Sequence, residues 1–139
     1  MKKHSLIATA RHLLAHAATA SSGRSAETVY GGHEHVLRHT LIALMQGRSL
    51  AEHDSEGEAT IYVIHGRVRL STDDAHWDGM TGDLLELPPS RHRLDALDSS
   101  RAVLGQSQIQ DKILSLRVQL RPLRGRLDVD TADTTPGAE

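Results

Sequence analysis

The chain has 139 residues and a formal net charge of −2, so its length fits one domain and its charge gives no general attraction to nucleic acid or membranes. It has no cysteine, which excludes disulfides and thiolate metal sites. Phenylalanine is also absent, and Trp77, Tyr30 and Tyr62 are the only aromatic residues. The core must therefore be aliphatic, and stacking platforms for nucleic-acid bases are not expected.

The first predicted element is a helix over residues 5–20, where alanine is abundant. The apolar residues that share one face at helical spacing are Leu6, Leu13, Leu14 and Ala17. The pattern ends at Ser21, Ser22 and Gly23. The polar residues Arg11, His12 and His16 interrupt the apolar stretch, which a secretory signal would need unbroken. No run is long enough to span a membrane, and we expect a cytoplasmic protein with no membrane partner.

After Gly31 and Gly32 the pattern changes to short strands broken by glycine and proline. The runs are "HVLRHTLIAL", "ATIYVIHG", "RVRLSTDD", a strand at Leu84–Leu87, and two strands around Asp98–Ser100. Trp77 is assigned to a turn region, where an indole usually caps the edge of the core. The sequence predicts an all-β sandwich or barrel with one short N-terminal helix. No second helical run separates the strands, which argues against a parallel α/β sheet.

The C-terminal part alternates strictly between apolar and polar residues. Its apolar positions are Leu114, Leu116, Val118 and Leu120, with arginines among the intervening residues. We interpret the arginines as a solvated outer face, with an anionic partner as the alternative. The apolar face has to be buried, and an exposed strand edge recruits a partner, so we expect a homodimer. Pro122 ends this strand, and the polar residues after it are expected to be disordered.

Two motifs make the chain resemble a small single-domain cupin of the RmlC-like superfamily over residues 28–104. The first motif has glycines at Gly47 and Gly66 with His53, Ser55 and Ala59 at fixed spacings between them. The second is "GDLLELPPSRH", from Gly82 to His92. The resemblance implies a jelly-roll barrel, the double-stranded β-helix, over residues 28–121, after a helical segment at 1–27 and before a tail at 122–139.

The resemblance also implies a metal site, but one that has lost part of its ligand set. Cupins hold a metal with two histidines and a glutamate in the first motif and one histidine in the second. His53 matches the first histidine, and His92, one residue short of the usual spacing, matches the last. Ser55 and Ala59 occupy the places of the second histidine and the glutamate. Two histidines hold a divalent metal weakly, because catalytic sites usually have about three protein ligands.

The segment "GGHEHVLRH" offers His33, His35 and His39 as candidates for a third ligand, although plain surface histidines are the simpler interpretation. Two hypotheses follow. The first is a non-catalytic or regulatory cupin that binds a small organic ligand through His53, Ser55 and His92, with no cofactor or a weakly bound Fe, Mn, Ni or Zn ion. The second is a metal-dependent enzyme of the dioxygenase or isomerase type. A structural module with an empty barrel remains a third reading. The histidines expected to be exposed are His12, His16, His65 and His76.

Overall fold

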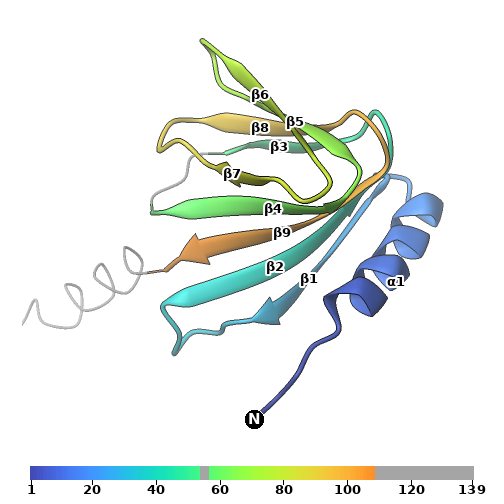
Figure 1. Cartoon of the computed structure of the whole chain (residues 1–139), viewed down its shortest axis with the longest axis vertical. Coiled ribbons are helices and arrows are strands. Elements are labelled where there is room, and N and C mark those ends of the chain that lie inside the picture. The colour runs from blue at the N-terminus through green and yellow to red at the C-terminus, as the bar shows by residue number, and fades with distance from the viewer. Residues whose placement is uncertain (54–56, 109–139) are drawn as a thin grey trace, which may run out of the picture. The chain divides into compact units, whose positions relative to one another are not determined.

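The computed structural model describes residues 1–53 and 57–108, and at residues 51–53 the description extends to the backbone only. Within these residues one helix is followed by strands that alternate with short turns (Figure 1). The elements are α1 (Leu6–Thr19), β1 (Arg24–Tyr30), β2 (Leu37–Leu44), β3 (Ser49–His53), β4 (Ala59–His65), β5 (Arg67–Ser71), β6 (His76–Met80), β7 (Leu84–Glu86), β8 (His92–Ala96) and β9 (Ser100–Ser107).

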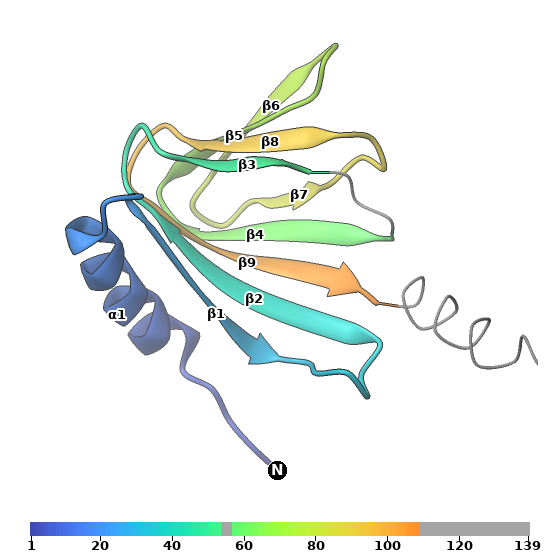
Figure 2. The ribbon, with the colours of Figure 1, turned by 180° about the vertical axis from the view of Figure 1, so that it is seen from behind.

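The strands form two antiparallel sheets that face each other (Figures 1 and 2). One sheet has five strands in the order β1-β2-β9-β4-β7, and the other has four in the order β3-β8-β5-β6. Neighbours in each sheet are mostly distant in sequence, as β4 and β9 are, so the chain crosses repeatedly between the layers. This is the jelly-roll, all-β architecture that the sequence predicts.

The space between the sheets is filled by aliphatic side chains at every second position. On β4 the buried residues are Ala59, Ile61 and Val63, and on β9 they include Ala102 and Leu104. Side chains alternate between the two faces of a strand, so this period of two marks the interior face of the barrel. The same period lets each remaining strand position be assigned to the interior or to the outer face.

A second, smaller core lies on the outer face of the five-stranded sheet. Ala10, Leu13 and Ala17 of α1 pack there against Leu41 and Ala43 of β2, and the helix lies over β1 and β2 (Figure 2). The strand β2 is therefore buried on both faces, which explains why residues 41–44 form an uninterrupted apolar run.

The predicted helix, the strands at 37–44, 59–65 and 84–86 and the four exposed histidines are confirmed. Strand β1 was not expected. Its first residues, from Arg24, lie in the helical segment assigned to 1–27, after the predicted helix at 5–20. The assignment of Trp77 to a turn is wrong, because pairing with β5 makes it part of strand β6. The predicted strand at 114–120 and the tail at 122–139 lie outside the described residues. Among the described helices, none has the length and apolar character needed to cross a membrane.

Candidate functional site

The two histidines of the cupin-like motifs are brought together by strand pairing. His53 ends β3 and His92 begins β8, and their Cα atoms are register partners in the antiparallel ladder. They lie 39 positions apart in the printed sequence, so only the pairing of β3 with β8 makes them neighbours. Directly opposite positions are those at which cross-strand pairs of side chains meet in antiparallel sheets.

His92 belongs to the interior face of the barrel. The residue is only 2% exposed, and it lies on the same face of β8 as the buried residues Leu94 and Ala96. Its Nδ1 lies 3.1 Å from the carbonyl oxygen of Ser90. A carbonyl oxygen only accepts hydrogen bonds, so Nδ1 carries the proton, and in the neutral ring Nε2 has the lone pair. This tautomer directs the accepting or coordinating nitrogen away from the Ser90 loop.

The two remaining motif positions differ in how far they are described. Ser55 lies in residues 54–56, outside the described part of the chain. Ala59, at the position of the cupin glutamate, is buried in the interior core and is 8% exposed. A methyl group therefore lies where the family pattern has a carboxylate.

The candidate third ligands gather elsewhere in the fold. His33 is exposed, and the Nδ1 of His35 accepts a hydrogen bond from the backbone N–H of Gly32 at 3.2 Å. The ring of Tyr30 lies with its centroid 5.0 Å from that of His35 and 6.2 Å from that of His39.

His39 shares its strand face with Leu41 and Ala43, which contact α1, so it lies on the outer face of the sheet. His92 lies on the interior face. The structure thus groups His35 and His39 with Tyr30 and does not bring them to His92. In the described side chains, no three histidine or carboxylate residues converge on a common point.

Several polar residues near the start of β2 and the end of β9 are in phase with the interior face, and they were not recognised from the sequence. Arg38 and Thr40 share the face of Ile42 on β2, and Gln106 shares the face of Leu104 on β9. Arg38 and Gln106 are register partners. The alternation along β2 was the signal that could have found them, because it sets Arg38 and Thr40 in phase with Ile42.

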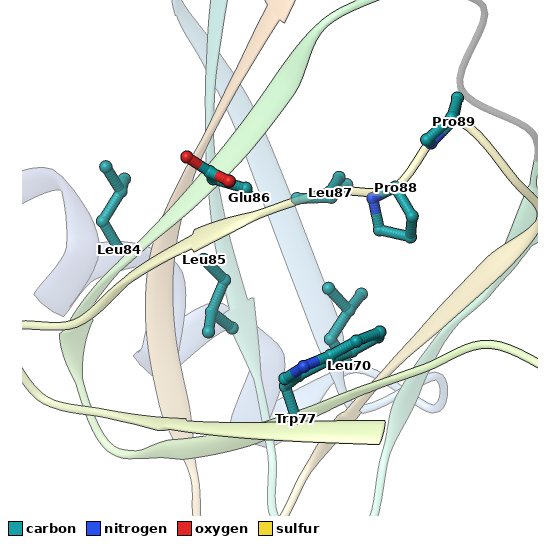
Figure 3. Close-up of a pocket in the computed structure, with 8 residues that line it drawn as sticks. All are labelled: Leu70, Trp77, Leu84, Leu85, Glu86, Leu87, Pro88 and Pro89. Carbon is teal, nitrogen blue, oxygen red and sulfur yellow. The ribbon is translucent and has the colours of Figure 1, made fainter. Parts of the chain in front are cut away.

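A cavity of about 650 Å³ opens between β6 and β7. These strands are the edges of the two sheets. The lining residues, shown in Figure 3, are Leu70, Trp77, Leu84, Leu85, Glu86, Leu87, Pro88 and Pro89. Seven of these eight are apolar, and His92 is not among the described lining residues.

Trp77 forms one wall of this cavity because of its register. It pairs with Leu70, which lies in the interior core, so the two side chains share the inward face (Figure 3). Across the gap, Leu85 and Leu87 pack against the same core. Gly79 of β6 lies beside Leu85, and a Cβ atom there would come within 2.9 Å of Leu85 Cδ1. The missing side chain therefore lets β6 approach β7 closely at one end of the cavity.

The opposite face of the β5–β6 hairpin is held by an ion pair. Arg69 donates to Asp78 from Nε at 2.7 Å and from Nη2 at 3.1 Å. The hydrogen bond from Arg69 is the main cause that lowers the pKa of the Asp78 carboxyl. Because Asp78 follows Trp77 directly, this bidentate contact also holds the strand that carries the indole.

No protein-family model and no curated protein matches the chain, but many solved structures resemble its fold. A cupin 2 conserved barrel domain protein from Salinispora arenicola is 19% identical with a TM-score of 0.58, over 84% of this chain and 98% of that one. An RmlC-like cupin protein from Desulfovibrio desulfuricans is 22% identical with a TM-score of 0.54, over 60% of this chain and 81% of that one. A cupin superfamily protein from Desulfitobacterium hafniense is 15% identical with a TM-score of 0.56, over 60% and 76%.

The protein therefore has the fold of a cupin β-barrel. This confirms the fold that the two sequence motifs indicate. At these identities the likeness concerns the fold alone, and cupin-type barrels carry many unrelated activities.

Proposed function

We propose that this protein binds a small organic ligand in its barrel and is non-catalytic or regulatory. The observation that carries the proposal is the apolar cavity between β6 and β7, whose volume of about 650 Å³ lies in the range of about 300–1,000 Å³ that is typical of small-molecule sites. Five of its eight lining residues lie on the consecutive strands β5, β6 and β7, and Leu87, Pro88 and Pro89 follow directly after β7.

The lining suggests a ligand with a flat or compact apolar body. Trp77 offers an indole that is 48% exposed, and Pro88 and Leu87 lie across from it (Figure 3). Burial of apolar ligand surface against such groups contributes about 25 cal/mol per Å². The polar contacts proposed from the sequence, His53, Ser55 and His92, suit a carboxylate or carbonyl group. Because His92 does not line this cavity, they would meet a part of the ligand that extends beyond it.

Trp77 also supplies the assay, because it is the only tryptophan in the chain. A set of small organic acids and uncharged ring compounds is screened by thermal shift, and hits are titrated by Trp77 fluorescence. Trp77→Ala is then compared with Tyr62→Ala by calorimetry. Tyr62 is a matched control since it is an aromatic residue of similar exposure, 45%, on the outer face of β4.

We expect hits to bind Tyr62→Ala as they bind the unmodified protein, and to bind Trp77→Ala at least about fivefold more weakly, since an aromatic wall contributes about 1 kcal/mol or more. Equal affinity in both variants would remove the cavity assignment. If no compound changes the melting temperature, the structural module with an empty barrel becomes the better interpretation.

A metal-dependent enzyme of the dioxygenase or isomerase type is the second candidate, because the register pairs His53 with His92. The described donors do not fit a catalytic cupin centre, since Ala59 contributes no ligand and no described third donor converges. A weakly held Fe, Mn, Ni or Zn ion on the two histidines is what this pair would support. Stoichiometric metal in untagged protein, lost in both His53→Ala and His92→Ala, would favour this candidate. Ligand binding that is insensitive to a chelator would favour the first.

A further inference from the structure

The outer surface of α1 carries a pair of histidines that the barrel does not use. His12 and His16 are both exposed and lie four residues, about one helical turn, apart. Their ring centroids are 5.3 Å apart, with the planes at 67° to each other. The rings therefore already lie together on one face of the helix.

The helix is anchored in a way that keeps this face towards solvent. Ala10, Leu13 and Ala17 pack against the five-stranded sheet and fix the rotation of α1 about its own axis. At its N-terminus, the hydroxyl of Ser5 accepts a hydrogen bond from the backbone N–H of Ala8, which caps the helix. The backbone that carries His12 and His16 is thus held by the fold, and little conformational entropy would be lost when both rings bind one ligand.

We propose that His12 and His16 form a binding site for one divalent transition-metal ion of the Zn, Ni or Cu class. With metal–nitrogen bonds of about 2.1 Å and a near-tetrahedral angle, the centroids of two imidazoles on one ion lie about 5 Å apart. The observed separation of 5.3 Å matches this distance. Two histidines at this helical spacing form one half of a common zinc-binding arrangement, and water fills the remaining positions.

The surroundings select the kind of ion. The first acidic residue of the chain is Glu27, in the middle of β1, so α1 itself carries no carboxylate. Purely imidazole donors suit Zn, Ni and Cu, whereas Mg and Ca require oxygen ligands. Arg11 is adjacent in sequence and opposes the bound charge, which limits the affinity. A metal binds the unprotonated imidazole nitrogen, so protons compete with the ion for the site.

This site is independent of the proposed ligand cavity and of the His53 and His92 pair. It lies on α1, on the outer face of the five-stranded sheet, whereas His92 is buried between the sheets. The protein can therefore carry a metal ion without any metal in the barrel. Metal content by itself would not reveal which pair of histidines holds the ion.

The test is calorimetric titration of the full, untagged chain with ZnCl2 and with NiCl2 at pH 7.5 and pH 5.5. The variants are His12→Ala, His16→Ala, His92→Ala and the double variant His16→Ala with Ala18→His. The double variant keeps the total of ten histidines but moves one off the shared face. The substituted helix positions 12, 16 and 18 are exposed, and thermal unfolding without metal verifies that each variant folds.

We expect one ion per chain at pH 7.5 on the helix site, retained in His92→Ala. Removing either helix histidine, or breaking the spacing, should weaken it about tenfold or more, because the second ligand no longer acts at a high effective concentration. Binding should be weaker at pH 5.5 than at pH 7.5, because protons compete with the metal for the imidazole nitrogens. Unchanged affinity in His12→Ala, or in the double variant, would overturn the proposal.

Discussion

Gly66, which joins β4 to β5, is a position where a single added methyl group should be strongly destabilising. Its φ is +112°, a conformation that L side chains rarely adopt. A Cβ atom would lie 2.3 Å from Ser100 Oγ and 2.8 Å from Ser100 Cα, so part of the conflict is with backbone. Ser100 is itself held there, since its hydroxyl accepts from the N–H of Arg67 and donates to the carbonyl of Asp98 at 2.7 Å.

The matched control is Gly82, which has a φ of +92° but nothing within 4 Å of an added Cβ. Gly82→Ala should therefore lower the free energy of unfolding by the backbone strain alone, about 1–2 kcal/mol. Gly66→Ala adds overpacking, which typically costs about 1–3 kcal/mol more. We expect a total loss of about 2–5 kcal/mol at Gly66.

Urea unfolding followed by circular dichroism measures both losses, with the slope of each transition compared between variants. The reasoning depends on the difference between the two glycines rather than on either value. Equal destabilisation at Gly66 and Gly82 would show that the contact with Ser100 relaxes at no cost, and the steric argument would be refuted.

Two further predictions concern the outer faces of the sheets. Leu41→Ala should lower the free energy of unfolding by about 2–5 kcal/mol, because Leu41 is 0% exposed beneath α1. Leu84→Ala, at a residue that is 61% exposed, should change it by about 0.5 kcal/mol or less. Similar losses for the two variants in urea unfolding would contradict the second core. Asp78→Asn should destabilise the protein slightly at neutral pH, because Arg69 lowers the pKa of the folded carboxyl. The stabilisation by this ion pair is complete above the unfolded pKa of about 3.9 and is lost as the pH falls through the lower folded pKa. The urea midpoints of the variant and the unmodified protein should therefore converge on acidification. A difference between the midpoints that stays constant with pH would refute this.

Local patterns were sufficient for the fold class. The period of two along 59–63 predicts a strand with one buried face, and helical spacing predicts the N-terminal helix. Strand β1 escaped prediction because "RSAETVY" has no regular alternation and buries little of its surface. Trp77 was misassigned because the turn residues around it dominate the local signal, whereas its pairing with Leu70 depends on β5.

By itself, the sequence determined that this is an all-β barrel with an apolar, aliphatic interior, and that His53 and His92 occupy matching motif positions. The strands and the aliphatic interior follow from periodicity and composition, whereas the barrel and the motif positions of His53 and His92 follow from the resemblance to cupins. The tertiary structure alone decided that the face of β2 with His39 is the outer one, that Arg38 pairs with Gln106 and that Trp77 forms the wall of a cavity. Those outcomes depend on register between strands distant in sequence, and a shift of one residue would send each side chain to the opposite face.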